Sequence, residues 1–162
     1  MNKLANAFGK EFLKHKDMVR TRAFELGGHV FKVKVPLTAE FEAMQERMKL
    51  VDDERVNSYY EQLTAGLVPL KTAKDSKIKC EWLENDVLLD GRSMRETAKN
   101  KILLENRITE MCKMLVPEEQ GFDMNEITYE MIEELFPFPI QMQLVDEISK
   151  TVSPSYEVQK GK

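Results

Sequence analysis

Residues 23–35 read AFELGGHVFKVKV, two apolar runs joined by a pair of glycines. Glycine readily adopts the positive φ angles that a two-residue hairpin turn requires. The pattern therefore predicts a β-hairpin with strands at 21–26 and 29–35. In the second strand apolar residues alternate with lysines, which predicts one buried face and one face in contact with solvent.

The rest of the chain shows mainly the apolar spacing of amphipathic helices. A short helix is predicted over residues 3–16, and Thr38 is predicted to cap the helix that follows the hairpin. Residues 70–81 are polar and rich in lysine, which indicates a loop. Asp90-Gly91 is expected to form a turn.

Two capping patterns mark helix starts in the second half of the chain. Ser93 with Glu96, and Asp123 with Glu126, have the spacing of a capping box. The prolines of Phe-Pro-Phe-Pro at 136–139 are expected to force the preceding phenylalanines into extended geometry. The predicted fold class is α+β and predominantly helical, with an N-terminal β-hairpin followed by a bundle of amphipathic helices.

The length of 162 residues suits a single domain spanning 1–162. The loop at 70–81 is the only candidate for a soft boundary inside it. The tail at 151–162 is expected to be flexible.

Charge is distributed unevenly along the chain, whose net charge is −4. Residues 1–22 carry six Lys or Arg against two acids, whereas residues 114–149 carry nine acids and no Lys or Arg. These two regions would either pair, within one molecule or between molecules, or remain two solvated faces that salt screens.

Several function classes lack their usual sequence signals. The two cysteines, Cys80 and Cys112, and the two histidines, His15 and His29, have no metal-ligand spacing. Phosphate-loop and nucleophile motifs are also missing from the sequence, so we expect no enzyme, no metal and no cofactor. The sequence has neither a secretory signal nor a membrane-spanning run, which makes the cytoplasm the default location.

A nucleic-acid-binding module is the main alternative class. The basic N-terminal region could contact phosphates together with four lysines of the predicted loop. These lysines are Lys71, Lys74, Lys77 and Lys79. The acidic last third opposes this interpretation, because its carboxylates repel nucleic acid. We therefore expect neither nucleic acid nor membrane as a partner.

The acidic region is also rich in Met and Phe, which suits adaptable contact with another polypeptide. The residues predicted to bind a partner are Phe122, Met131, Phe136, Phe138 and Met142. Helical spacing favours a core position for a second, overlapping set: Ile127, Met131, Leu135, Leu144 and Ile148. For Phe136 and Phe138 two roles stay open, as plugs at the edge of the core or as contacts with another chain.

Residues 24–44, FELGGHVFKVKVPLTAEFEAM, resemble the tail assembly chaperones of long-tailed bacteriophages. Residues 24–48 carry the pattern, a glycine-turn hairpin followed by Lys-Val, Pro-Leu-Thr and an acidic helix. The resemblance implies a non-enzymatic protein that binds the tape measure protein and helps to assemble the tail tube.

The resemblance also implies which partners to expect. They are the tape measure protein, the tail tube protein and, as candidates, a second copy of this chain and a frameshifted longer product of the same gene. The terminal Lys160-Gly161-Lys162 is compatible with a slippery codon run. Alternative functions are a structural minor tail or capsid component, or a cytoplasmic protein-binding adaptor.

Overall fold

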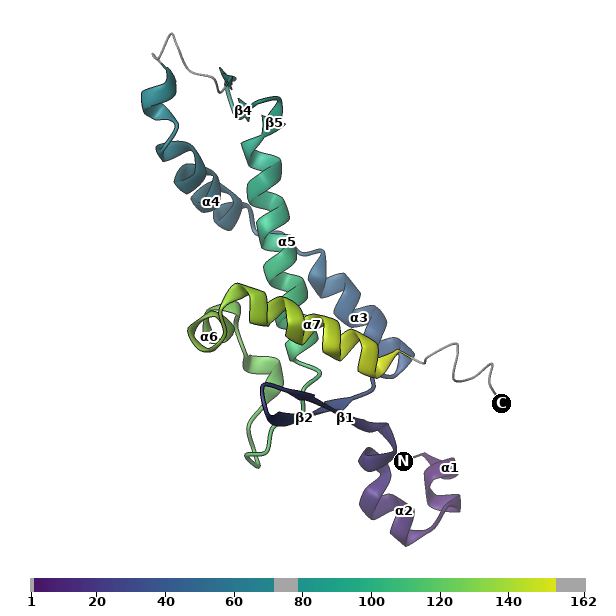
Figure 1. Ribbon diagram of the computed structural model, residues 1–162. Helices are drawn as coiled ribbons and strands as arrows, with labels where there is room; N and C mark the ends of the chain where they lie inside the picture. Colours follow the sequence, from purple (N-terminus) through teal and green to yellow (C-terminus); the bar gives the residue numbers. More distant parts are fainter. Residues whose placement is uncertain (1, 72–78, 154–162) are drawn as a thin grey trace, which may run out of the picture. The chain divides into compact units, whose positions relative to one another are not determined.

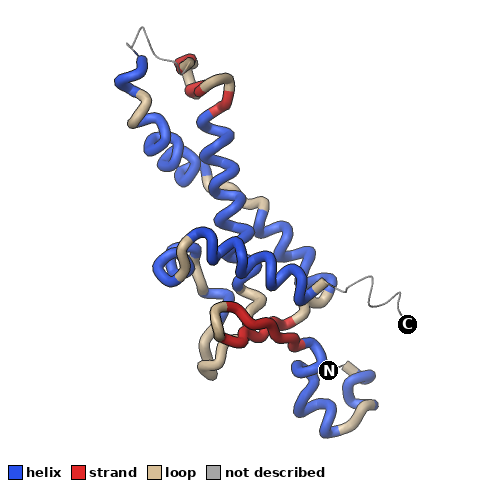
Figure 2. The backbone as a smooth tube through the Cα atoms, viewed as in Figure 1, coloured by secondary structure: helices blue, strands red, loops and turns tan. Residues whose placement is uncertain are grey.

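The structure is a computed structural model that describes residues 2–71 and 79–153 (Figure 1). Its chain forms two compact units. The discontinuous unit comprises Met1–Gln45 and Ile108–Lys162, and the inserted unit comprises Glu46–Arg107. Each contains helices and a small antiparallel sheet, which confirms the α+β, predominantly helical fold class (Figure 2).

The unit boundaries fall at residues 45/46 and 107/108. Most of the predicted soft boundary at 70–81 lies outside the described residues, as does most of the predicted tail at 151–162. Lys74 and Lys77 of the predicted loop, and the terminal Lys-Gly-Lys, fall there too. The single domain over 1–162 stays a prediction.

The N-terminal hairpin consists of β1 (Thr21–Leu26) and β2 (His29–Lys34), as predicted. Both glycines of the turn have positive φ angles, 61° and 83°, as the tight turn requires. The rings of Phe24 and Phe31 stack on the face of the hairpin that holds buried residues, with their centroids 5.4 Å apart. This apolar face positions the core of the discontinuous unit.

The second edge of β2 pairs with the segment that leaves helix α5 (Met94–Cys112). The backbone N–H of Val116 donates to the carbonyl of Lys32 at 2.8 Å, and that of Lys34 donates to the carbonyl of Met114 at 3.0 Å. The extended segment therefore pairs with the edge of β2 that β1 leaves open.

Helix α7 (Phe138–Val152) covers the apolar face of the hairpin and contacts both strands (Figure 1). The amphipathic spacing of α7 turns its apolar side toward the sheet. The guanidinium of Arg22 also donates to the carbonyl of Thr151 at 2.9 Å. The most deeply buried apolar side chains of this unit are Val33, Ile108, Leu144 and Ile148. The predicted core positions of Leu144 and Ile148 are thus confirmed.

The chain before the hairpin forms three short elements instead of the single helix predicted over 3–16. They are α1 (Lys3–Ala7), α2 (Lys10–His15) and the 3-10 helix η1 (Lys16–Arg20). The prediction is wrong because Gly9 has a φ angle of 94°, which a helix cannot contain. None of the three elements contains a buried residue.

Helix α3 (Thr38–Met48) starts one residue earlier than predicted, with Thr38 as its first residue rather than its cap. The N–H of Leu37 donates to the carboxylate of Glu40 at 3.0 Å, which is the reciprocal half of a capping box. Arg20 donates to the same carboxylate at 2.6 Å. The hydrogen bond from Leu37, followed by the interaction with Arg20, lowers the pKa of Glu40.

The inserted unit contains α4 (Asp53–Ala65), the 3-10 helix η2 (Val68–Lys71) and a three-stranded sheet. Its strands are β3 (Cys80–Trp82), β4 (Val87–Leu89) and β5 (Arg92–Ser93), paired in the order β3-β4-β5. The end of the predicted loop therefore lies in a strand.

Two local predictions in this unit are confirmed. Asp90 and Gly91 make the turn between β4 and β5, with φ angles of 49° and 82°. The hydroxyl of Ser93 accepts a hydrogen bond from the N–H of Glu96 at 3.1 Å and so caps α5.

Candidate partner-binding surface

The corner between α6 (Tyr129–Leu135) and α7 carries most of the residues predicted to bind a partner. Asp123 caps only the 3-10 helix η3 (Met124–Glu126). The hydroxyl of Thr128 then accepts from the N–H of Met131 at 3.3 Å and starts α6. Helix α6 is therefore shorter than the capping pattern at Asp123 predicted.

The two phenylalanines of the Phe-Pro-Phe-Pro segment differ in conformation. Phe136 is extended, with φ −126° and ψ 128°, as predicted. Phe138 is the first residue of α7, so the prediction that it leaves the helical path is wrong. Pro137 supplies the extended residue at the helix start, and the helix accepts Pro139 because first-turn N–H groups have no helical partner.

A buried glutamine fixes this corner. Gln141 is 1% exposed, its amide nitrogen donates to the carbonyl of Phe136 at 2.8 Å, and its amide oxygen accepts from the hydroxyl of Tyr129 at 2.9 Å. One side chain thus joins the start of α6, the connection and α7. A buried amide with both ends satisfied holds the connection in one geometry.

The outer side of the corner exposes large apolar side chains, although Ile132 of α6 is buried. We define the α6–α7 face as Met131, Leu135 and Phe138, which are 45%, 71% and 50% exposed. Met131 and Leu135 are four residues apart, so they lie on the same side of α6. The core position predicted for Met131 and Leu135 is therefore wrong.

The remaining predicted residues are placed differently. Phe122 lies in the exposed connection before η3, whereas Phe136 and Met142 are half-buried. Ile127, predicted to be in the core, is also half-buried. Leu135 was not among the residues predicted to bind a partner. Thr128, a residue type preferred at helix caps, was the signal that α6 starts at Tyr129 and leaves Ile127 outside it.

Acidic side chains surround the α6–α7 face. Glu130, Glu133 and Glu134 of α6 are exposed, and Asp146 of α7 forms an exposed ion pair with Lys150 at 2.9 Å. An apolar face set among carboxylates stays soluble and attracts basic segments.

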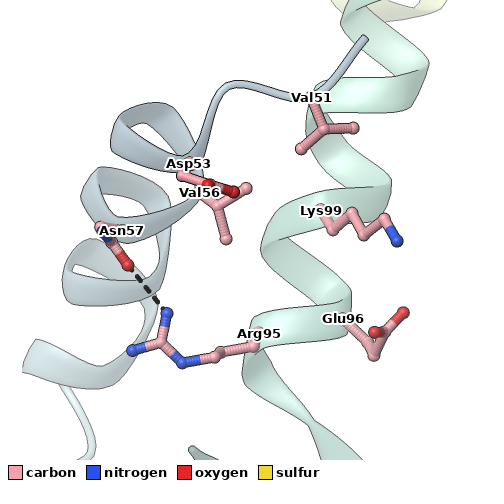
Figure 3. Close-up of a pocket in the computed structure, with 7 residues that line it drawn as sticks. All are labelled: Val51, Asp53, Val56, Asn57, Arg95, Glu96 and Lys99. Carbon is pink, nitrogen blue, oxygen red and sulfur yellow. Dashed lines mark hydrogen bonds between the residues drawn. The ribbon is translucent and has the colours of Figure 1, made fainter. Parts of the chain in front are cut away.

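The inserted unit contains a hollow of about 560 Å³ between α4 and α5 (Figure 3). Asn57 and Arg95 point toward each other across it, and the guanidinium donates to the amide oxygen at 2.8 Å. Arg95 also lies over the ring of Tyr60, 4.1 Å from its centroid. The other lining residues are Val51, Asp53, Val56, Glu96 and Lys99. The lining offers charges but no serine, cysteine or histidine as a nucleophile or base.

A polar network in the inserted unit surrounds one buried carboxylate. Glu105 is 3% exposed, and its carboxylate accepts from Arg55 at 2.6 Å and from the hydroxyl of Tyr59 at 2.7 Å. Lys101 lies over the ring of Tyr59, 4.2 Å from its centroid. Burial, and then the hydrogen bond to Glu105, raise the pKa of Tyr59. This network joins α4 to α5 and needs no ligand to explain it.

Metal-ligating clusters and membrane-spanning helices are both absent from the part of the chain that the structure describes. No group of three or more His, Cys, Asp or Glu in residues 2–71 and 79–153 is placed to hold a metal ion. Within those same ranges no helix has the length and apolar character to cross a membrane.

Comparisons with known proteins add no relative, since no protein-family model, no curated protein and no solved structure matches this chain.

Proposed function

We propose that this chain is a non-enzymatic binding protein of the tail assembly chaperone kind, which holds the tape measure protein in the bacterial host cytoplasm. One observation carries the proposal. The α6–α7 face presents Met131, Leu135 and Phe138 to solvent on a corner that Gln141 fixes, inside a region of nine acids without a Lys or Arg.

The chemistry of this face suits a long helical client. Methionine and leucine side chains are flexible enough to fit apolar stripes in more than one register. Burying the part of each side chain that is still exposed contributes about 1 kcal/mol. Contacts of this strength are weak singly and strong when many copies bind one chain, as a coat on an extended client requires.

The phage context of the proposal rests on the resemblance of residues 24–48 to tail assembly chaperones. On that basis the bound tape measure protein is delivered to tail tube subunits. A frameshifted longer product would carry the same α6–α7 face with a different end.

Co-expression with the tape measure protein of the same phage tests the proposal. Wild-type chain should keep the client soluble, and the triple variant Met131→Ser, Leu135→Ser, Phe138→Ser should lose most of that effect while keeping its helical circular dichroism. Leu50→Ser with Leu83→Ser is the matched control, because these exposed leucines belong to the inserted unit. Equal solubilisation by the triple variant and the wild type would reject this surface.

Purified phage particles separate the chaperone from a structural tail or capsid component. A chaperone should be absent from the mass spectrum of finished particles. A stoichiometric amount of this chain in them would instead assign it to the particle.

A further inference from the structure

The N-terminal arm, residues 2–20, exposes apolar side chains that no described residue of its own unit covers. No residue of α1, α2 or η1 is buried, and four large apolar side chains are between 61% and 74% exposed. These residues are Leu4, Phe8, Met18 and Val19. Phe8 packs edge-on against Phe12, with ring centroids 5.0 Å apart, but both belong to the arm.

Helices as short as those of the arm need a surface to hold them. Helices α1 and α2 contain five and six residues. Isolated helices below about 12–15 residues are only marginally stable in water, so packing must supply the stability. Among the described residues, the main packing of α1 is on α2, and that of α2 is on η1. We therefore expect the arm to be completed by another surface.

Charge indicates what that surface must be. Residues 1–22 hold six Lys or Arg against two acids. One of these lysines, Lys14, has an acidic neighbour in Glu11 at 3.6 Å, and both side chains are well exposed. A complementary surface must be both apolar and acidic, which is the description of the α6–α7 face and its glutamates.

Within one copy the arm does not lie on that face. The arm leaves the hairpin at the strand end opposite the turn, on the side away from α6 (Figure 1). The hydroxyl of Thr21 donates to the carbonyl of Asp17 at 2.7 Å, and Lys34 pairs with the carboxylate of Asp17 at 3.3 Å. These contacts tie the base of the arm to the strand ends.

We propose that the N-terminal arm of one copy docks on the α6–α7 face of a second copy. Leu4 and Phe8 meet Met131 and Leu135, and the arm lysines face the carboxylates of α6. The contact joins two different surfaces, so it repeats head to tail and builds a ring or an open filament. This inference uses only surfaces of this chain and does not rest on the proposed client.

Sedimentation velocity of the purified full chain tests the contact. Wild-type chain should form species larger than a dimer as its concentration rises. Raising the salt from about 0.05 M to about 0.5 M should weaken the association, because screening shortens the reach of the charges. A wild-type chain that stays monomeric at every concentration would overturn the proposal.

Two complementary variants make the test specific. The arm variant Leu4→Ser, Phe8→Ser and the face variant Met131→Ser, Leu135→Ser should each associate at least about 10-fold more weakly than wild type, as loss of central apolar contacts does. Mixed together, they should form a dimer that grows no further, since the arm variant keeps its face and the face variant keeps its arm. The inserted-unit control Leu50→Ser, Leu83→Ser should associate like wild type.

Each contrary result has a defined meaning. If either double variant alone associates like wild type, or if the mixture stays monomeric, the two surfaces do not meet. Phosphatidylserine vesicles provide the remaining comparison. Arm-dependent binding to these vesicles by a chain that does not self-associate would assign the arm to a membrane surface and overturn the proposal.

Discussion

The two units of this protein each have an apolar core and differ in the polar groups and exposed faces around it. The discontinuous unit buries aliphatic side chains between a hairpin and α7, with Val33, Leu144 and Ile148 fully enclosed. The inserted unit also buries apolar side chains, among them Val87, Ala98 and Ile102, and adds a polar network around the buried carboxylate of Glu105. The discontinuous unit groups exposed apolar side chains among carboxylates at the α6–α7 face, whereas in the inserted unit Arg55 and Arg95 bind polar groups of their own unit.

This difference indicates a division of roles. An apolar core tolerates substitutions that conserve its volume, and large exposed apolar patches mark surfaces that bind partners. A buried ion pair demands fixed geometry and is costly to leave half made. We infer that contacts with other chains belong to the discontinuous unit. The following substitutions test the contrast.

The largest expected effect is in the apolar core. Leu144→Ala should lower the free energy of unfolding by about 3–4 kcal/mol, because it removes a fully buried side chain and leaves a cavity. Leu135→Ala, on the exposed face, should change it by no more than about 0.5 kcal/mol. Urea unfolding followed by circular dichroism measures both, and similar losses would mean that the core is wrongly assigned.

A smaller effect is expected in the ionic network of the inserted unit. Glu105→Leu should cost about 2–3 kcal/mol, because it leaves Arg55 and Tyr59 without this carboxylate, although Arg55 stays partly solvated. Fluorescence of Trp82, the only tryptophan, reports unfolding of this unit.

Replacing all three members of the network should recover most of the free energy of unfolding that Glu105→Leu loses. In the triple variant Glu105→Leu, Arg55→Met, Tyr59→Phe no member of the trio is left with a stranded charge or hydroxyl. A triple variant that is less stable than Glu105→Leu alone would show that the polar network stabilises the unit more than apolar side chains in its place do.

Gln141 is a buried polar residue of the discontinuous unit, as is Glu110. Gln141→Leu should cost about 1–2 kcal/mol, because it removes the hydrogen bonds that Gln141 makes to the carbonyl of Phe136 and the hydroxyl of Tyr129. Gln143→Leu is the matched control on the exposed side of α7. Amide hydrogen exchange should quicken in α6 for the first variant only, and unchanged exchange there would contradict the corner-fixing role.

The smallest effect concerns Asp86, whose carboxylate accepts from the hydroxyl of Ser93 and from the N–H groups of Val87 and Arg95. Burial acts to raise the pKa of Asp86, but these hydrogen bonds outweigh it and the pKa is lowered from 3.8. The folded state thus favours the charged form. Its contribution is complete above the unfolded pKa and is lost as pH falls through the lower folded value.

Asp86→Asn should therefore cost about 1 kcal/mol at pH 7, and the difference from wild type should shrink as the pH drops below about 4. Urea unfolding at a series of pH values, followed by Trp82 fluorescence, measures it. Glu84→Gln is the exposed control and should change the stability at pH 7 by no more than about 0.5 kcal/mol. A gap between Asp86→Asn and wild type that does not narrow as the pH falls would contradict the assignment.

Local chemistry explains what was predictable from the sequence. The Gly27-Gly28 turn, the Asp90-Gly91 turn and the Ser93 cap each depend on side chains and backbone angles within a few residues. The pairing of 114–116 with β2 depends on residues far apart in sequence, which no local pattern encodes. The same holds for the Glu105 network.

The candidate site was predictable only in part for a related reason. Met131 and Phe138 belong to a Met- and Phe-rich acidic region that composition alone reveals. Helical spacing places Met131 and Leu135 on one side of α6, but it does not say whether that side or the side of Ile132 faces the core. That choice depends on tertiary packing, and Ile132 is the residue that is buried.

The covering of the hairpin by α7 has a consequence for synthesis on the ribosome. Strands β1 and β2 are complete at Lys34, but the helix that shields Phe24 and Phe31 emerges only with residues 138–152. At about 5–20 residues per second, roughly 100 further residues take on the order of 5–20 s to translate. During that interval the nascent chain exposes Phe24 and Phe31 of the hairpin, and a ribosome-associated holdase would be expected to bind them.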